Sequence, residues 1–106
     1  MVSKSHISAY EWSVLCKYGS LYNYPQDVMF ACEKAVALAP KYRLARSRRG
    51  LARALTGDYN GATEDLKVFV KQTNNSNKYK SRAQSWIKDL RNGKNPFTPE
   101  VLEELR

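Results

Sequence analysis

The chain has 106 residues, of which 42% are hydrophobic and 26% are charged, a composition typical of one small folded domain. Eighteen basic and ten acidic residues give a formal net charge of +8, which favours anionic partners. No stretch approaches the ~20 apolar residues of a membrane-spanning helix, and the sequence begins without the apolar core of a signal peptide. We therefore expect a cytoplasmic protein without a membrane partner.

Residues that commonly carry enzymatic chemistry are scarce in this sequence. His6 is the only histidine, and the two cysteines are too few for a disulfide framework or, with one histidine, for a zinc site. Glycine-rich phosphate-binding motifs do not occur. The sequence thus predicts a protein that is not an enzyme and that uses no cofactor or metal.

Apolar residues recur at helical spacing, whereas the alternation typical of strands is almost absent. The first predicted helix covers about 8–20, with Trp12 and Leu15 on its apolar stripe. A second helix is predicted to begin near Tyr24–Asp27, where a proline lies in the first turn, and to end before Pro40.

The rest of the chain continues the helical pattern, with predicted helices over about 42–56, 60–73, 78–92 and 99–105. Gly57 and Gly93 follow two of these helices, as is common at helix C-termini. Thr98 and Pro99 have the residue types preferred at the start of a helix. We expect an all-α fold whose short turns make neighbouring helices antiparallel.

Positive charge is concentrated in two stretches. Residues 41–53 hold six basic and no acidic residues, and residues 77–95 hold six basic residues and one acidic residue. Such stretches attract nucleic acid or acidic proteins, and they also keep a surface solvated.

Residues 9–42 and 43–76 can be aligned as two units of 34 residues without an insertion, with Ala9 and Arg43 at position 1. We refer to this alignment as the frame. In the second unit Gly50 falls at position 8 and Ala62 at position 20, where two helices of a pair approach closely. Over about residues 9–76 the chain therefore resembles the tetratricopeptide repeat (TPR) family. It also resembles the short TPR tails that end larger bacterial signalling proteins.

The resemblance implies a right-handed superhelix of antiparallel helix pairs, with about two repeats and C-terminal capping helices. It divides the chain into an N-terminal tail, repeat 1, repeat 2, a capping helix and a short C-terminal helix, at 1–8, 9–42, 43–76, 77–95 and 96–106. We expect the natural C-terminus near Arg106 and any missing domain upstream.

The frame assigns structural roles to several side chains. Arg49 falls at position 7, and Asp65 falls at position 23 of the facing helix. A charge at a packed position is costly unless it is paired, so we predict a structural salt bridge between these two residues. Trp12 and Trp86 are interpreted as core anchors rather than as platforms for a ligand.

Cys16 and Cys32 take positions 8 and 24 of the first repeat. We interpret them as small buried hydrophobes near each other. The alternative is a redox pair, which requires thiolate character and solvent exposure.

In TPR proteins the first helix of each pair lines a concave groove that binds another protein. The positions of this sequence that match the groove combine cations with leucines: Lys17, Leu44, Arg48, Leu51, Leu55, Lys78 and Arg82. Lys78 and Arg82 match the last two elements of the clamp by which some members hold a terminal carboxylate, whereas Ser13, Lys17 and Arg48 depart from it. The predicted function is a protein–protein interaction scaffold that binds an acidic and apolar segment.

Two other functions stay open at this point. Nucleic acid would bind through the basic stretches 41–53 and 78–94, where Tyr42 and Tyr79 lie near cations. Alternatively the module is purely structural, and the open face of its first helix contacts a missing upstream domain or a second copy.

Overall fold

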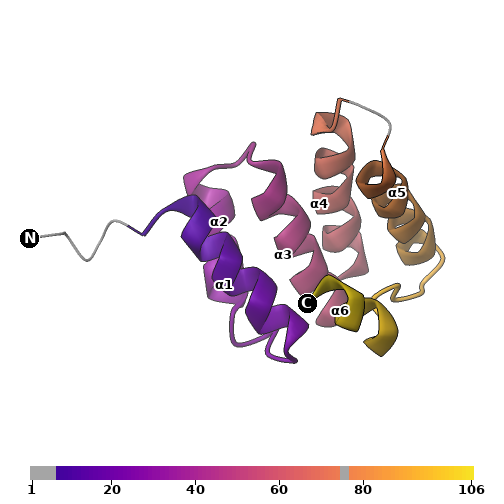
Figure 1. Cartoon of the computed structure of the whole chain (residues 1–106), viewed down its shortest axis with the longest axis horizontal. Coiled ribbons are helices and arrows are strands. Elements are labelled where there is room, and N and C mark those ends of the chain that lie inside the picture. Colours follow the sequence, from indigo (N-terminus) through magenta and orange to yellow (C-terminus); the bar gives the residue numbers. More distant parts are fainter. Residues whose placement is uncertain (1–6, 75–76) are drawn as a thin grey trace, which may run out of the picture.

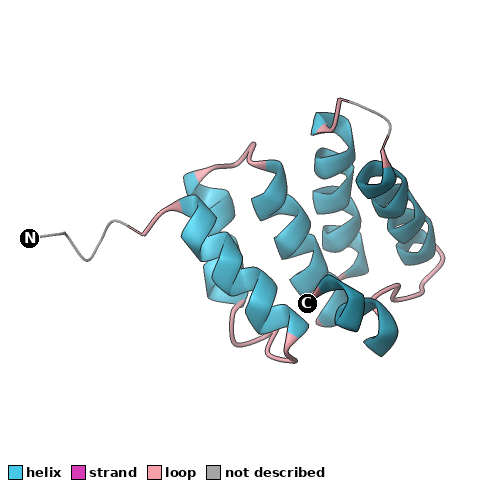
Figure 2. Cartoon of the chain, viewed as in Figure 1, coloured by secondary structure: helices cyan, strands magenta, loops and turns pink. Residues whose placement is uncertain are grey.

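The computed structural model describes residues 7–74 and 77–106, and within these ranges the chain forms helices and loops without any strand (Figure 2). Figure 1 shows the six helices, which are α1 (Ala9–Leu21), α2 (Met29–Leu38), α3 (Arg43–Leu55), α4 (Tyr59–Gln72), α5 (Lys78–Arg91) and α6 (Pro99–Leu105). The predicted all-α fold is therefore confirmed. His6 and most of the predicted tail 1–8 lie outside the described residues.

One helix begins later than predicted. We expected the second helix to start near Tyr24–Asp27, but residues 25–28 form a turn and α2 begins at Met29. Asn23 has a φ of 76°, which turns the chain after α1, and the Val28 N–H donates to the Tyr24 carbonyl at 3.2 Å. Pro25 and Asp27 therefore lie in a turn that precedes α2, not in the first turn of the helix.

Side-chain caps fix the helix ends. Ser8 and Glu11 form a reciprocal capping box at the start of α1. Asp58, Asn77 and Thr98 each accept a backbone N–H at the starts of α4, α5 and α6. Glycines with positive φ follow α3 and α5, at Gly57 (92°) and Gly93 (76°).

Helices α1 to α5 lie side by side in chain order and form a short stack (Figure 1). Helix α1 packs on α2, α3 packs on α4, and α1 and α2 both pack on α3. Helix α5 packs chiefly on α4. Helix α6 returns across the stack and contacts α1, where the Arg106 guanidinium donates to the Leu21 carbonyl at 2.8 and 3.1 Å.

The main hydrophobic core joins α1, α3, α4, α5 and the C-terminal segment. Its largest members include Leu21, Leu51, Leu66, Ile87, Phe97 and Leu102. Two smaller clusters hold α1, α2 and α3 together. The buried face of α1 contains Ser13, Cys16, Ser20 and Leu21. Leu15 is 43% exposed, so its predicted place on the inward stripe was wrong.

Cys16 and Cys32 form a disulfide between α1 and α2. Both side chains are fully buried in the core and close together, as predicted, but the sequence analysis did not predict that a disulfide joins them. The physical reason is proximity, because their Cα atoms lie 4.9 Å apart, within the range that a disulfide spans.

Candidate functional site

A cavity of about 410 Å³ opens between α1, α3 and α5, with α4 at its base and the C-terminal segment at one end. We call it the groove. Its volume lies within the ~300–1,000 Å³ common for ligand sites. Five leucines and four aromatic residues contribute to its lining: Leu21, Leu44, Leu51, Leu66, Leu105, Phe69, Tyr79, Trp86 and Phe97.

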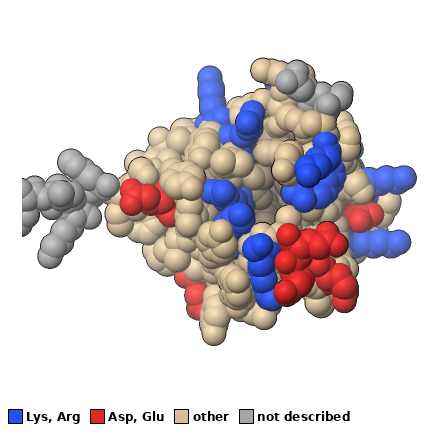
Figure 3. All heavy atoms as spheres, viewed as in Figure 1, with Lys and Arg blue, Asp and Glu red and all other residues tan. Residues whose placement is uncertain are grey.

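The lining also contains four cations, and no acidic residue of the described chain is part of it: Lys17, Arg43, Arg48 and Arg82. Figure 3 shows basic side chains around a hollow in this face, with an acidic cluster over α6 at its edge. A cavity lined by charges of one sign attracts ligands of the other sign.

The structure brings together five of the seven residues that the sequence predicted for partner binding: Lys17, Leu44, Arg48, Leu51 and Arg82. The other two, Leu55 and Lys78, do not line the groove. Leu55 packs against the main core, and the Lys78 ammonium lies 5.2 Å from the centre of the Tyr79 ring.

Helix α3 presents two different faces, and its sequence explains why. Leu44, Arg48 and Leu51 are separated by four and three residues, so they share the face that lines the groove. Arg46, Arg49 and Arg53 have the spacing of three and four on the opposite side. The basic stretch 41–53 is therefore divided between two environments.

The second face of α3 surrounds Asp65 of α4, whose side chain is completely buried. Arg49 donates to both carboxylate oxygens of Asp65 at 2.9 Å, which is the predicted ion pair. Arg46 and Arg53 were not predicted to take part, and they donate to the same carboxylate at 2.9 and 3.2 Å. One buried carboxylate thus binds three arginines.

Glu33 of α2 completes this cluster by accepting from Arg49 at 3.0 Å. Burial of the Arg49 guanidinium lowers its pKa, but the hydrogen bonds and negative charges of Asp65 and Glu33 outweigh burial and raise the pKa above its ordinary value. Arg49 therefore stays charged within this cluster.

The cations of the groove have neutral neighbours instead. Among the ion pairs of residues 7–74 and 77–106, none includes Lys17, Arg43, Arg48 or Arg82. The Arg48 guanidinium donates to the Ser13 hydroxyl at 2.7 Å. The Arg82 guanidinium lies 5.4 Å from the Tyr79 ring and 4.8 Å from the Trp86 ring. These contacts orient the charges without neutralising them.

Sequence reasoning missed the aromatic side of the groove. Tyr79, Arg82 and Trp86 recur at intervals of three and four residues, so they share one face of α5. This spacing was visible in the sequence and could have placed both aromatic rings beside Arg82. Trp86 also packs against the main core, so its predicted role as an anchor is compatible with its place in the groove.

Comparisons with known proteins return no match: no family model fits the chain, and no curated protein or solved structure is significantly similar to it. The resemblance to TPR repeats therefore depends on the residues quoted above. No helix in the described part of the chain is long and apolar enough to cross a membrane.

Proposed function

We propose that this protein is a non-enzymatic interaction module whose groove binds an acidic and apolar segment of another protein. The observation that carries the proposal is a set of cations that form no ion pair within residues 7–74 and 77–106 and that line one cavity with leucines and aromatic rings. Arginine binds carboxylates through two parallel hydrogen bonds, and the apolar base can bury a side chain of the segment.

We further propose that α1–α2 and α3–α4 are two TPR-like repeats of a right-handed superhelix, with α5 and α6 as caps. The packing of α1 on α3, the first helices of the two pairs, supports this arrangement. So does Gly50, where a Cβ would lie 3.3 Å from the Ala62 carbonyl oxygen, because position 8 of the frame requires close approach. A scaffold role in a larger bacterial signalling protein stays a prediction from resemblance.

The test uses a short capped peptide that carries glutamates and leucines, with binding measured by fluorescence anisotropy. We expect Arg48→Glu together with Arg82→Glu to weaken binding at least about tenfold, because both groove cations become repulsive. Lys88→Glu with Arg91→Glu is the control, since it changes the net charge equally at exposed residues of α5 outside the groove. Unchanged affinity in the groove variant, or an equal loss in the control, would contradict the proposal.

Nucleic-acid binding is the second candidate, favoured by Tyr79, which is 50% exposed beside Lys78 and Arg82. Cations of α5 would make most of the contacts with nucleic acid, because Arg46, Arg49 and Arg53 of α3 already bind carboxylates. Nucleic-acid binding would be favoured if the affinity for a single-stranded oligonucleotide falls steeply with salt and is unchanged by Arg48→Glu.

Self-association is the third candidate. Tyr18 and Phe30, together with Leu15 and Leu38, expose between 43% and 59% of their surface on α1 and α2. Sedimentation at rising protein concentration tests whether these side chains mediate contact between copies.

The cytoplasmic location expected from the sequence also stays a prediction. The Cys16–Cys32 disulfide argues against it, because disulfides persist in oxidising compartments. Blocking free thiols at the moment of cell lysis, followed by mass spectrometry, shows which state the protein has in its source cell.

A further inference from the structure

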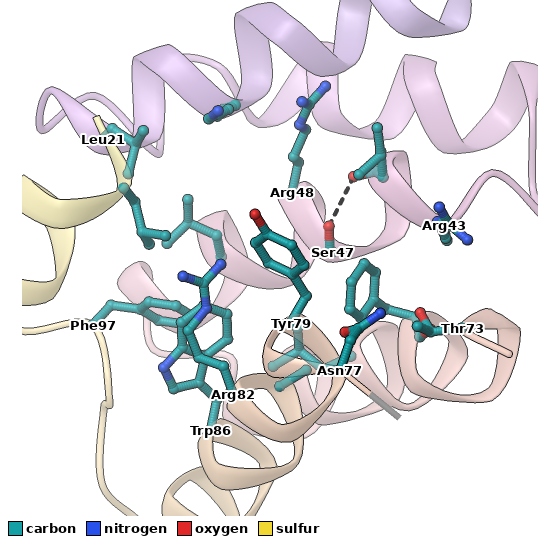
Figure 4. A pocket seen from close by; sticks show the side chains of 17 residues that line it. Leu21, Arg43, Ser47, Arg48, Thr73, Asn77, Tyr79, Arg82, Trp86 and Phe97 are labelled. Atoms are coloured by element: carbon teal, nitrogen blue, oxygen red, sulfur yellow. Dashed lines mark hydrogen bonds between the residues drawn. The ribbon is translucent and has the colours of Figure 1, made fainter. Parts of the chain in front are cut away.

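The two ends of the groove differ in chemistry. Figure 4 shows Leu21, Trp86 and Phe97 at one end, with Arg82 beside Trp86, and Arg43 and Thr73 at the other, with Arg48, Tyr79 and Asn77 between them. We name them the α6 end and the Arg43 end. A segment with charged and apolar residues therefore makes different contacts in its two possible orientations along the groove.

The α6 end is walled by apolar side chains. Phe97 is only 4% exposed, and its ring centre lies 4.7 Å from that of Trp86. Leu105 of α6 lines the cavity, and the hydrogen bonds from Arg106 to the Leu21 carbonyl hold α6 against α1. Phe97 and Leu105 offer a carboxylate no hydrogen bond, and the cation beside this wall is Arg82, whose guanidinium lies 4.8 Å from the Trp86 ring.

The outer surface of α6 reinforces this difference. Glu100, Glu103 and Glu104 are exposed, and the acidic cluster over α6 is visible at the edge of the hollow in Figure 3. Glu103 pairs with Arg106 at 2.7 Å, and Glu100 and Glu104 repel an acidic residue that approaches the α6 end while leaving an apolar side chain unaffected.

The Arg43 end has the opposite character. Arg43 is exposed, and none of the described ion pairs includes it. Asn77 also lines the groove, and its side-chain amide oxygen accepts from the Lys80 backbone N–H and caps α5. Acidic residues at this end gain an attractive charge and stay in contact with water.

From these differences we infer that α6 is an end wall that sets the direction of the bound segment. The segment places one bulky apolar side chain against Trp86, Phe97 and Leu105, and its acidic residues extend past Arg48 and Arg82 toward Arg43. This inference rests on the proposed function and adds the polarity and the anchor residue of the ligand.

The experiment uses two capped peptides of equal composition, one with leucine and glutamates in separate blocks and one with them interleaved. We expect the block peptide to bind more tightly, and replacement of its leucine by alanine to weaken it at least about tenfold. A photoreactive phenylalanine analogue in place of the leucine should cross-link to Trp86, Phe97 or α6. The same analogue at the glutamate end should cross-link near Arg43 and Asn77.

Two variants separate the ends of the groove. Leu105→Ala should weaken the block peptide about threefold and leave an all-glutamate peptide unchanged. Arg43→Glu should weaken both peptides, and circular dichroism checks that each variant is folded.

The outcomes distinguish the two proposals. Suppose that the Arg48→Glu, Arg82→Glu variant loses binding, but that the photoreactive residue at one peptide position cross-links to both ends of the groove in the natural sequence. This result would overturn the proposed direction and keep the proposed function. Absence of binding by every peptide would overturn both.

Discussion

Between α1 and α2 the contact includes a buried disulfide, whereas between α3 and α4 apolar packing is joined by a buried carboxylate that binds three arginines. The two pairs share one 34-residue frame. Cys16 and Cys32 occupy the positions that Gly50 and Leu66 occupy in the second pair. The comparison teaches that equivalent positions of a shared sequence frame can bring two helices together through different chemistry.

The largest expected effect concerns the second pair. Asp65→Ala should destabilise the protein by about 3–5 kcal/mol, because it leaves Arg46, Arg49 and Arg53 crowded together without their buried partner. Urea denaturation measures the free energy of unfolding. Glu64→Ala is the matched control on the same helix, where an exposed pair with Lys67 is lost, and a similar cost in both variants would refute the special role of Asp65.

The matching break in the first pair is the removal of the disulfide. Cys16→Ala with Cys32→Ala should lower the free energy of unfolding by about 3 kcal/mol, because the unfolded chain regains the freedom that a cross-link over 16 positions removes. Reducing agent should lower the stability of the natural sequence and leave the double variant unaffected. Equal sensitivity of the two proteins to reductant would show that the cysteines are not paired.

A smaller effect sharpens the comparison within α1. Gly19→Ala should cost about 1–3 kcal/mol, because the added Cβ would overlap the Val28 side chain at the turn before α2. Val28→Ala in the same chain should recover part of the loss, and a double-mutant cycle measures the coupling. If the effects of Gly19→Ala and Val28→Ala on the free energy of unfolding are additive, the overlap with Val28 is not the cause of the loss.

The smallest effect concerns the first cap. The Glu11 carboxylate accepts from the Ser8 backbone N–H at 3.0 Å, and the Ser8 hydroxyl accepts from the Glu11 backbone N–H at 3.1 Å. Hydrogen bonding to the backbone and then the side chain of Ser8 lowers the pKa of the Glu11 carboxyl below its ordinary value. A lowered pKa stabilises the folded state above the pKa of the unfolded chain, and the benefit disappears as the pH falls through the folded pKa. NMR titration should show this low pKa, and Ser8→Ala should raise it.

The sequence predicts most of the helices because apolar periodicity and caps are local signals. It also predicts five groove residues and the partners Arg49 and Asp65, because a fixed frame converts distance along the chain into position on a helix face. The start of α2 was predicted too early, since a proline beside an acid occurs in turns as well as in helices.

What the sequence did not predict depends on distances between helices. Nothing local distinguishes two buried thiols from a disulfide, so Cys16 and Cys32 required three-dimensional structure. Arg46 and Arg53 resemble solvated charges until α4 brings Asp65 among them. The α6 end of the groove exists only because the last helix returns to the first.

That return has a consequence for how the molecule comes apart. In a stack of repeats each unit contacts its neighbours, so the ends can fray one unit at a time. Here Arg106 bonds to a carbonyl 85 positions earlier, and Leu21 belongs to the same core as Leu102. The contact links the first helix to the last, so opening α6 also uncovers the end of α1. Amides in the first and last helices should therefore exchange with solvent together, in one cooperative event.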